Sequence, residues 1–449
     1  MRGVRAVVLA AGKGTRMKSA VPKVFHELCG RSMLWWVLQA LHGTGVEEIV
    51  VVASPEMEEV LATMKAGGRI VVQREQLGTG HALRIALEAL EPRKGGRILV
   101  ANGDMPLVTP EIFRGVIGAL GDGAMSLVTV RAEATSNFGR IVRKGERVER
   151  IVEARDATPV ELAIEETNAG IYAIDEAKAR DAVGALRNEN AQREYYLTDT
   201  VERLASAGER VTPVLCREES SLVGINDRTE LASARRSMNE RLCAAHMRDG
   251  VTIVDPQTTY LEPELEIGRD TVIYPNTAIT RLSRIGEGCT LGPNARFSNA
   301  KVGNRTEVRE SVILDSTIGD DAHVGPFAHL RGETVLGNEV RIGNFVELKN
   351  AKLGIAAKAS HLSYIGDATV GDEANVGAGT ITCNFDGTRK NRTKIGKRAL
   401  IGSNSSLVAP VEIGDDALTG AGSVVTKDVP AGGRVAGNPA RPLPKKKPS

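Results

Sequence analysis

The first residues whose types and spacing suggest chemistry form a glycine-rich turn near the N-terminus. The segment VRAVVLAAGKGTRM, which begins at Val4, is an apolar run followed at once by small residues, and Pro22 and Lys23 lie beyond it. Small residues allow main-chain N–H groups to approach the oxygens of a triphosphate, while Arg16 and Lys23 supply positive charge. The pattern is neither the Walker motif nor the dinucleotide motif. A plain strand–turn–helix corner is the alternative.

A carboxylate lies in a second turn that follows an apolar run. The sequence NGDMPL (Asn102 to Leu107) comes directly after the strand-like segment Arg97 to Ala101. Asp104 is therefore placed to hold a cation against phosphate oxygens. A structural aspartate in a Gly-Asp turn would have the same local sequence, so the motif alone leaves both interpretations open.

A histidine in the C-terminal half suggests a different chemistry. His361 lies in SHLSYIGDA (Ser360 to Ala368), which is followed by NVGAGTITCNFDG (Asn375 to Gly387). Near neutral pH a histidine can act as a general base, the role that is needed when an amine attacks a thioester. An isolated histidine is more often structural, so its surroundings must decide between the two roles.

These C-terminal residues lie in a repeat with a period of six. Aliphatic residues recur at every sixth position, and most of them are followed by glycine. An inward aliphatic residue followed by one that tolerates a tight bend is what a parallel β-helix needs. Ordinary glycine turns in an α/β domain are the alternative, which the fixed period argues against. The series is Ile318, Val324, Leu330, Leu336, Ile342 and Leu348, and then Ile395, Ile401, Leu407, Ile413 and Thr419.

Two corners of this repeat carry a cation where glycine is usual. Arg331 follows Leu330, and Lys349 follows Leu348 eighteen residues later. If one coil consists of three hexads, the two cations lie above one another, about 4.8 Å apart. Stacked like charges repel, which predicts an anion between them, such as a sugar phosphate. Two solvated corner residues are the alternative.

The repeat is interrupted between Gly377 and Ile395, so we expect this segment to project as a loop with a binding role. His361 comes two hexads after Lys349 and is expected on a different face of the coil. Completing a site would then require a neighbouring subunit, which makes a trimer the working hypothesis.

The N-terminal half alternates between strand-like and helix-like segments. Such alternation predicts a Rossmann-like, mainly parallel sheet with helices on both faces and ligands at the carboxyl ends of its strands. After the first strand, the expected helices are Leu34 to Leu41, Glu56 to Met64 and His81 to Leu90, and the expected strands are Glu48 to Ala53, Arg69 to Gln73 and Arg97 to Ala101.

The segment between the two halves is typical of one amphipathic helix. Gly224 to Gly250 carries apolar residues at spacings of three or four, with Asn226 or Asp227 as the N-cap and Gly250 as the stop. We therefore expect a first domain at residues 1–226, a helical linker at 227–249 and a second domain at 250–449. The apolar residues of this helix are Leu231, Ala234, Met238, Leu242 and Ala245.

Composition limits the function further. A net charge of +2 gives no sign of a nucleic-acid or membrane-surface protein. Five widely spaced cysteines without a CxxC pair argue against a zinc site and a disulfide framework and fit a reducing cytoplasm. No leader pattern and no apolar run of roughly 18 residues is present, so we expect a soluble protein.

Seven N-terminal motifs occur in the order that is seen in sugar-phosphate nucleotidyltransferases. The chain resembles the family of bifunctional N-acetylglucosamine-1-phosphate uridylyltransferase/glucosamine-1-phosphate acetyltransferases. That family implies an α/β nucleotidyltransferase domain followed by a left-handed parallel β-helix of hexapeptide repeats, assembled as a homotrimer. The motifs are LAAGKGTRM, PKV, QLGTGHA (Gln76 to Ala82), GDMPL, FGRI (Phe138 to Ile141), IVEA (Ile151 to Ala154) and NAGIY (Asn168 to Tyr172).

For the first half, the resemblance implies transfer of a uridylyl group. A sugar-1-phosphate oxygen attacks the α-phosphorus of UTP and pyrophosphate departs, so the protein mainly has to align two polyanions and neutralise charge. The resemblance implies that Asp104 and Asn226 ligate Mg²⁺ and that Gly139, Glu153 and Asn168 bind the sugar phosphate, Asn226 lying also within the nucleotide-sugar site. The implied UTP contacts are Leu9, Ala10, Ala11, Gly12, Lys23, Gln73, Gly78 and Thr79. Asn102 departs from the family pattern, which usually has an aromatic residue there.

For the second half, the resemblance implies transfer of an acetyl group from acetyl-CoA to glucosamine-1-phosphate, with His361 as the base. The implied glucosamine-1-phosphate contacts are Arg331, Lys349, Tyr364, Asn375 and Lys390. The implied acetyl-CoA contacts are Ala378, Asn384, Phe385, Ser403 and Ala421, with Arg441 as a candidate for the CoA phosphate.

Two features depart from the family at this site. Phe385 stands where tyrosine is more usual and lacks the hydroxyl, and the tail GNPARPLPKKKPS is shorter and more basic than expected. Lys445 to Lys447 fit a solvated, disordered end.

The favoured interpretation is a cytoplasmic enzyme that acetylates glucosamine-1-phosphate and couples the product to UMP, giving UDP-N-acetylglucosamine. A second interpretation retains only nucleotidyl transfer and treats the β-helix as an oligomerisation or effector-binding module. A third treats the repeat half as a non-catalytic scaffold. His361, the stacked cations and the NFDG loop favour two activities.

Overall fold

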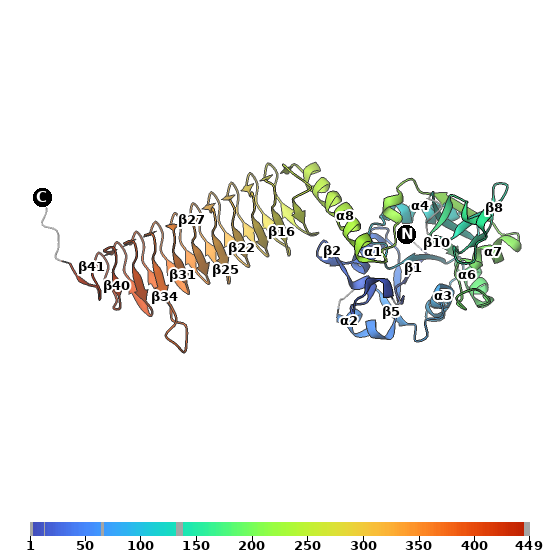
Figure 1. Ribbon diagram of the computed structural model, residues 1–449, viewed down its shortest axis with the longest axis horizontal. Helices are drawn as coiled ribbons and strands as arrows, with labels where there is room; N and C mark the ends of the chain where they lie inside the picture. The colour runs from blue at the N-terminus through green and yellow to red at the C-terminus, as the bar shows by residue number, and fades with distance from the viewer. Residues whose placement is uncertain (1–2, 13, 64–66, 132–137, 444–449) are drawn as a thin grey trace. The chain divides into compact units, whose positions relative to one another are not determined.

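The computed structural model describes residues 3–12, 14–63, 67–131 and 138–443. The chain forms two compact units, Met1–Met238 and Asn239–Ser449, and the division falls inside the long helix α8 (Arg228–Arg248; Figure 1). Lys445 to Lys447 and Met64, the predicted end of the second helix, lie outside the described residues. Within the described ranges, no helix is both long and apolar enough to cross a membrane.

A nine-stranded sheet forms the centre of the N-terminal unit. Its main path follows the order β11-β7-β10-β6-β1-β4-β5, and β8 and β9 form a hairpin beside β10. The strands are β1 (Val4–Leu9), β4 (Glu48–Ala53), β5 (Arg69–Val72), β6 (Arg97–Asn102), β7 (Met125–Arg131), β8 (Arg140–Lys144), β9 (Arg147–Val152), β10 (Glu166–Asp175) and β11 (Val211–Leu215). Strands β6, β1, β4 and β5 are parallel, whereas β10 runs antiparallel to β6 and β7. The sheet is therefore mixed, with a parallel half.

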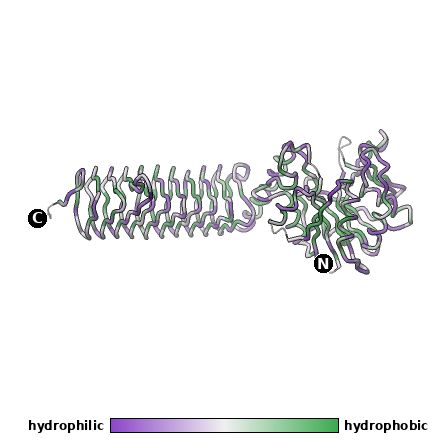
Figure 2. Tube along the Cα trace, turned by 90° about the horizontal axis from the view of Figure 1, so that it is seen from below, coloured by the Kyte–Doolittle hydropathy of each residue, from purple (hydrophilic) through white to green (hydrophobic). Residues whose placement is uncertain are grey.

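Helices cover both faces of this sheet. They are α1 (Met33–His42), α2 (Glu58–Thr63), α3 (Thr79–Glu88), α4 (Pro110–Leu120), α5 (Pro159–Leu162), α6 (Glu176–Gly184) and α7 (Asp199–Ser206). Helices α1, α2 and α4 share a core with Ala6 and Val8, whereas α3, α6 and α7 share a core with Val7 on the opposite face. Because neighbouring strand residues face opposite sides, a strand with a core on each side must be apolar throughout. Hydrophobic segments, green in Figure 2, run through the middle of the N-terminal unit, and the predicted Rossmann-like architecture is confirmed.

Helix α8 begins and ends at polar signals in its sequence. The Asp227 carboxylate accepts hydrogen bonds from the N–H groups of Thr229 and Glu230, so Asp227 is the cap rather than Asn226. Gly250, with φ +95°, follows the last turn. Cys243, which the predicted apolar stripe did not include, is fully buried in the core of the C-terminal unit.

The C-terminal unit is a left-handed parallel β-helix, as predicted. Short strands from successive coils stack into three sheets, called here the first, second and third sheets. The first contains β12 (Thr252–Ile253), β15 (Val272–Ile273), β18 (Thr290–Leu291), β21 (Glu307–Val308), β24 (His323–Val324), β27 (Arg341–Asn344), β30 (Lys358–His361), β33 (Asn375–Val376), β36 (Leu400–Ile401), β39 (Leu418–Thr419), β41 (Arg434–Ala436) and β42 (Arg441–Pro442). The second contains β13 (Tyr260–Leu261), β16 (Ala278–Thr280), β19 (Arg296–Ser298), β22 (Val312–Leu314), β25 (His329–Arg331), β28 (Glu347–Lys349), β31 (Tyr364–Gly366), β34 (Ile381–Cys383), β37 (Ser406–Val408) and β40 (Val424–Val425). The third contains β14 (Glu266–Ile267), β17 (Arg284–Ile285), β20 (Lys301–Val302), β23 (Thr317–Ile318), β26 (Val335–Leu336), β29 (Lys352–Leu353), β32 (Ala368–Val370), β35 (Thr393–Ile395) and β38 (Val411–Ile413).

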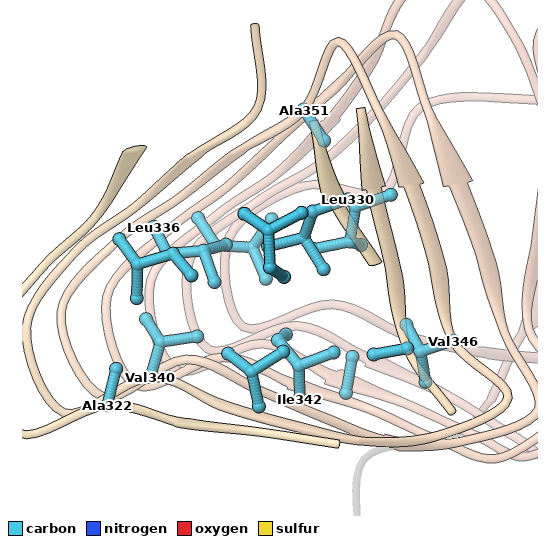
Figure 3. Packing of buried hydrophobic residues seen from close by; sticks show 14 of the residues in the cluster. Ala322, Leu330, Leu336, Val340, Ile342, Val346 and Ala351 are labelled. Atoms are coloured by element: carbon cyan, nitrogen blue, oxygen red, sulfur yellow. The ribbon is translucent and has the colours of Figure 1, made fainter. Parts of the chain in front are cut away.

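Stacked aliphatic side chains fill the interior of the β-helix. Leu330, Leu336 and Ile342 come from the three different sheets and point toward the same interior (Figure 3). Each is at most 2% exposed. The hexad aliphatic residues therefore form the core, as their period predicts.

Glycine follows many of these residues for a reason other than the expected tight bend. Gly319 and Gly402 do not have positive φ. A Cβ on Gly319 would lie 2.7 Å from the carbonyl carbon of Gly337 in the next coil, and one on Gly402 would lie 2.5 Å from the nitrogen of Ala421. The left-handed conformation instead occurs two residues after Gly319, at Asp321 (φ 55°). Glycine is thus required by the close approach of stacked coils, which corrects the sequence-based explanation.

Truncation of one interior residue should destabilise the β-helix alone. Leu330→Ala is expected to lower the unfolding free energy of the C-terminal unit by about 3 kcal/mol, because the neighbouring coils cannot close the cavity. Urea titration followed by circular dichroism would measure this, while the fluorescence of Trp35 and Trp36 in α1 reports on the N-terminal unit. Val335→Ala, at a residue that is 39% exposed, is the matched control. Equal effects of the two substitutions would contradict the assigned core.

Candidate functional site

A cleft at the carboxyl ends of β1 and β5 collects the whole set of residues predicted to contact UTP. It has a volume of about 580 Å³. Its predicted members are Leu9, Ala10, Ala11, Gly12, Lys23, Gln73, Gly78 and Thr79, and they are joined by Gln76, Asn102 and Asp104. Parallel strands place their carboxyl ends at one sheet edge, which explains why residues so distant in sequence meet here.

Two glycines allow close approaches of the main chain at this cleft, Gly78 in its lining and Gly14 against the lining residue Lys23. Gly14 has φ +58°, and a Cβ there would lie 2.6 Å from the Cβ of Lys23. Gly78 has φ +103°, and a Cβ there would lie 2.7 Å from the carbonyl oxygen of Tyr195. Gly78 also immediately precedes α3, so the N-terminal N–H groups of that helix lie at the cleft. A helix N-terminus is a favourable position for phosphate oxygens.

A second cleft, of about 490 Å³, opens beside the first and contains the predicted sugar-phosphate residues. Gly139, Glu153 and Asn168 line it, and the N–H of Asn168 donates to the carbonyl of Gly139 at 2.9 Å. The residues common to both clefts are Leu9, Thr79, Asn102 and Asp104. Two ligands lying in the two clefts would therefore meet at Asp104.

Cationic side chains lie directly on the two predicted metal ligands. The Lys23 ammonium contacts the Asp104 carboxylate and donates to the side-chain oxygen of Asn226 at 3.2 Å. Arg16 donates to the same oxygen at 2.9 Å. A main-chain hydrogen bond also holds the Asp104 and Asn226 segments together, because the N–H of Ile225 donates to the carbonyl of Asp104 at 3.0 Å. This arrangement shows that both oxygens are directed at one position that suits a cation.

Glu153 is held by a partner that the sequence motifs did not include. The Thr198 hydroxyl donates to its carboxylate at 3.0 Å. Burial raises the pKa of Glu153 and the charge of Asp156 adds to this, while the hydrogen bond from Thr198 opposes it. Nearby, Asn168 donates to the hydroxyl of the buried Tyr172 at 2.6 Å. The second cleft therefore presents uncharged hydrogen-bonding groups together with the carboxylates of Asp104, Glu153 and Glu230. Its amide, hydroxyl and Glu153 groups suit sugar hydroxyls.

A larger groove of about 800 Å³ also contains Glu153, but its lining holds more acidic than basic side chains, which is unfavourable for phosphate. Asp156, Asp181, Asp199 and Glu202 line it. Burial, followed by the charges of Glu153 and Glu202, raises the pKa of Asp199 to about 6. Carboxylates that already disfavour one another's ionisation would repel an anion, so the two smaller clefts are the better candidate.

In the β-helix, the two predicted stacked cations are paired in register. Arg331 in β25 lies opposite Lys349 in β28, which confirms their alignment along one edge. Arg331 donates to the Glu347 carboxylate at 2.6 Å. The neighbouring Lys390, followed by burial, lowers the pKa of Lys349, and Arg331 lowers it further. Three cations thus gather at one corner, as the sequence predicted for Arg331 and Lys349.

His361 lies on a different sheet from these cations, as predicted. It is the last residue of β30 in the first sheet, and Asn344 is its register partner one coil earlier. The Nδ1 atom of His361 lies 2.8 Å from the side-chain oxygen of Asn344. Because that oxygen can only accept, the contact is a hydrogen bond when Nδ1 carries the proton, and in the neutral ring this leaves Nε2 as the acceptor. This is the tautomer that a general base needs.

The predicted acetyl-CoA residues are divided between two corners of the coil. Ala378, Ser403 and Ala421 continue the column above His361, as successive hydrogen bonds show: Gly379 N to His361 O, Asn404 N to Ala378 O and Gly422 N to Ser403 O. Asn384 and Phe385 instead follow β34, so they lie at the corner where the strands of the second sheet end, whereas the first group lies at the corner before those strands begin. The outer face of the second sheet, including Tyr364, lies between the two groups.

The comparisons with known proteins agree with both halves. Residues 6–196 match the MobA-like NTP transferase domain, residues 256–364 the GMPPB C-terminal domain, and residues 392–427 the hexapeptide repeat of succinyl-transferase. The bifunctional protein GlmU of Carboxydothermus hydrogenoformans is 44% identical over 430 residues, which cover 95% of this chain and 96% of that protein. The GlmU of Geobacillus thermodenitrificans is 46% identical over 428 residues, covering 95% and 93%. The chain belongs to the GlmU family. The alignment with these GlmU proteins extends over both units, so neither half is an unrelated addition.

The loop of this GlmU-family chain is shorter than the sequence predicted. The interruption between Gly377 and Ile395 was expected to leave the coil, yet Ile381–Cys383 remains in it as β34. Residues 384–392 alone project, visible below β34 in Figure 1. Asp386 organises this loop, accepting hydrogen bonds from the N–H groups of Thr388 and Arg389 at 2.9 and 2.8 Å. The hexad count skipped the residues between Gly377 and Ile395, so it could not show that one strand in this range still pairs with the neighbouring coils.

Two predicted residues lie apart from the groups described above. Asn375 begins β33 in the first sheet, while Arg331, Lys349 and Tyr364 belong to the second. Arg441, in β42, is exposed and pairs with Ala436 near the end of the first sheet. A single chain therefore does not bring the full set of predicted acetyl-transfer residues onto one face.

Three residues of the candidate sites were missed by sequence reasoning in this GlmU-family protein. Asn344 was detectable, because the coil register places it one coil before His361. Thr198 was not, because its contact with Glu153 joins segments that only the folded sheet brings together. Tyr172 was quoted within the NAGIY motif but given no role.

Replacement of Glu153 should stabilise the N-terminal unit in a pH-dependent manner. The raised pKa of Glu153 means that the folded state holds this proton more tightly than the unfolded chain, so stability falls as pH rises between the two pKa values. Glu153→Gln keeps an acceptor for Thr198 and should raise the melting temperature at pH 8, with a difference that shrinks below about pH 4.3, the ordinary value for a glutamate. Tryptophan-fluorescence melts across pH would measure this.

Glu161→Gln provides a control of opposite sign. Hydrogen bonds from Thr158, followed by one from Arg150, lower the pKa of Glu161 to about 2. Its ionised form therefore stabilises the fold at neutral pH, and this contribution is lost as the pH falls toward that value. Glu161→Gln should lower the melting temperature at pH 8. The same sign for both substitutions would show that Glu153 is not a strained carboxylate.

Proposed function

We propose that this chain transfers the acetyl group of acetyl-CoA to glucosamine-1-phosphate and then transfers the uridylyl group of UTP to N-acetylglucosamine-1-phosphate. The products of the second step are UDP-N-acetylglucosamine and pyrophosphate. Membership of the GlmU family over both units supports two activities. The observation that carries the proposal is His361 with its Asn344 partner, a second set of catalytic groups that a nucleotidyltransferase alone would not need.

In the uridylyl reaction, the chain mainly positions and neutralises. The main-chain groups of Leu9 to Gly12 and the N-terminus of α3 bind the triphosphate, and Gly139, Glu153 and Asn168 bind the sugar phosphate in the adjoining cleft. The sugar-phosphate oxygen then attacks the α-phosphorus from the side of the second cleft, and the bond to the β-phosphate breaks. Lys23 and Arg16 offset the charge that develops.

The residues at Asp104 fit a divalent cation. Asp104 and Asn226 supply a carboxylate and an amide oxygen, the ligand types that Mg²⁺ prefers, and both already hold the Lys23 ammonium. We propose that these two residues hold Mg²⁺, which, when bound, neutralises phosphate charge and orients the reacting groups. Lys23 then contacts the phosphates instead.

In the acetyl reaction, Nε2 of His361 takes a proton from the amine of glucosamine-1-phosphate as the nitrogen attacks the thioester carbon. The carbon–sulfur bond then breaks, and the CoA sulfur receives the proton. Arg331, Lys349 and Lys390 bind the phosphate, with Tyr364 and Asn375 as further sugar contacts. Ala378, Ser403, Ala421, Asn384 and Phe385 bind acetyl-CoA, and Arg441 contacts its phosphate.

We propose a homotrimer in which neighbouring chains complete this site. Phe327, Phe345 and Leu362 occupy one corner of three successive coils, beside Asn344 and His361, and are 53%, 56% and 63% exposed. The two phenylalanine rings are stacked, with centroids 5.4 Å apart. A continuous exposed apolar column is typical of an interface. A second chain covering it would also bring its own groups to the exposed His361.

We assign the uridylyl activity to residues 1–226, the connecting helix to 227–249 and the acetyl activity to 250–449. A cytoplasmic location suits these substrates. It also suits the five cysteines, which are widely spaced and include no CxxC pair, because an oxidising compartment favours disulfide frameworks.

Two substitutions should separate the activities. His361→Ala is expected to lower the acetyl-transfer kcat by about a hundredfold to ten-thousandfold, the usual contribution of a general base, and to leave uridylyl transfer unchanged. Asp104→Asn should have the reciprocal effect. CoA release and pyrophosphate release measure the two reactions, and mass analysis identifies the products. Retention of acetyl transfer in His361→Ala, or its absence from the unmodified protein, would favour a β-helix that serves only assembly or regulation.

Disruption of the apolar column should separate the chains. Phe327→Asp is expected to reduce the mass measured by analytical ultracentrifugation from three chains to one, because a buried unpaired carboxylate would be costly at the interface. Acetyl transfer should fall while uridylyl transfer persists. Ile355→Asp, at a 52%-exposed residue on another corner, should leave both mass and activity unchanged. An unmodified protein that is a monomer with full acetyl transfer would exclude the shared site.

A further inference from the structure

A buried carboxylate connects the cation corner of the β-helix with the projecting loop. Asp367 is 8% exposed and follows β31 with φ +49°. Its carboxylate accepts hydrogen bonds from the side-chain amides of Asn350 at 2.7 Å and Asn384 at 2.6 Å. The three residues occupy the same corner in three successive coils, so Asp367 is the centre of a polar ladder.

The charges around Asp367 are mostly positive. Burial alone would raise its pKa, yet the hydrogen bonds from Asn350 and Asn384 and the charges of Lys349 and Lys390 hold the pKa below its usual value. Asp367 in turn raises the pKa of Lys349, against the larger lowering effect of Lys390. Within the described ranges neither lysine forms a salt bridge, and the nearby Arg331 is paired with Glu347. The carboxylate therefore offsets a cation pair that would otherwise repel.

Asp367 also holds the first residue of the loop. Asn384 accepts from the N–H of Asn391 at 2.7 Å, which closes the base of residues 384–392, and its side chain lies 3.4 Å from the Tyr364 hydroxyl. On the opposite side, the N–H of Asp367 donates to the carbonyl of Lys349 at 2.9 Å. One residue thus fixes the position of Asn384 relative to Lys349.

We propose that Asp367 is a positioning residue for acetyl transfer, which holds Asn384 in place for acetyl-CoA and places a buried carboxylate beside the Lys349–Lys390 pair that binds the sugar phosphate. The proposal rests on the proposed acetyl-transfer function. Its consequence is that one buried carboxylate tunes the binding of both substrates without contacting either.

The chain contains a matched corner that lacks these neighbours. Asp315 also follows a strand of the second sheet with φ +45°, and Asn299 donates to its carboxylate at 2.8 Å. It is exposed and lies on the same corner in an earlier coil. Asp315→Asn therefore reproduces the loss of a corner carboxylate without altering the lysine pair or the loop.

Asp367→Asn should change the two Michaelis constants in different ways. The KM for acetyl-CoA is expected to rise about tenfold at all pH values, because a hydrogen bond to a charged group is lost and an amide donor faces Asn384. The KM for glucosamine-1-phosphate should stay near the unmodified value at lower pH and rise at alkaline pH. Removing the carboxylate lowers the pKa of Lys349 further, so its charge is lost earlier as pH rises.

The decisive measurement is the pH profile of kcat/KM for glucosamine-1-phosphate in the full-length protein. Asp367→Asn should shift its alkaline limb to lower pH, whereas Asp315→Asn should not. Asp367→Glu keeps the negative charge but not the hydrogen-bond distances. It should return the alkaline limb to the pH of the unmodified protein but leave the KM for acetyl-CoA raised. Circular dichroism of every variant reports that the β-helix is folded, and uridylyl transfer reports on the N-terminal unit.

The outcomes distinguish this proposal from the one on which it rests. Absence of acetyl transfer from the unmodified protein would remove the proposed function itself. Acetyl transfer with identical alkaline limbs in the unmodified protein and Asp367→Asn would overturn the role of Asp367 alone. A third outcome would also overturn this role. If Asp367→Asn loses acetyl transfer and Asp367→Glu shows the same loss at every pH, Asp367 is a purely structural residue.

Discussion

Hydrogen bonds between the main chains of successive coils are the constraint on which the C-terminal unit depends. The N–H of Asn350 donates to Arg331 and that of Asp367 donates to Lys349, and similar bonds continue through most of the unit. Such bonds fix side chains in columns, because a residue cannot shift along its strand without breaking pairings on both sides. The alignment of His361 with Ala378 and Ser403 follows from this register rather than from contacts between those side chains.

In the N-terminal unit, charge balance has a comparable role. The parallel half of the sheet brings the ends of β1 and β6 together, with Leu9 opposite Asn102, and so places Asp104 between two clefts. A carboxylate beside two clefts that the proposed function assigns to polyanions would repel those ligands. The Lys23 ammonium on Asp104 removes this obstacle, and a metal ion would do the same.

The sequence predicted those features that depend on regular spacing. The period of six placed Arg331 over Lys349, and the apolar run Glu48 to Ala53 gave the bounds of β4, because both are properties of short segments. Features that depend on contacts between residues distant in the sequence were missed or were given the wrong explanation. The glycines are set by contact between coils, the loop begins only at Asn384 because β34 still pairs within the coil, and Thr198 reaches Glu153 only in the folded sheet.

The restriction of hydrogen bonds to adjacent coils also bears on how such a protein can evolve. Strands between Thr252 and Ile318 bond only to the strands directly before and after them in each sheet. If one complete turn in this region were duplicated or lost, every later turn would still bond to the same neighbouring turns as before. The number of turns that precede the residues proposed for acetyl transfer can therefore change without disturbing the geometry of the residues from Arg331 onward.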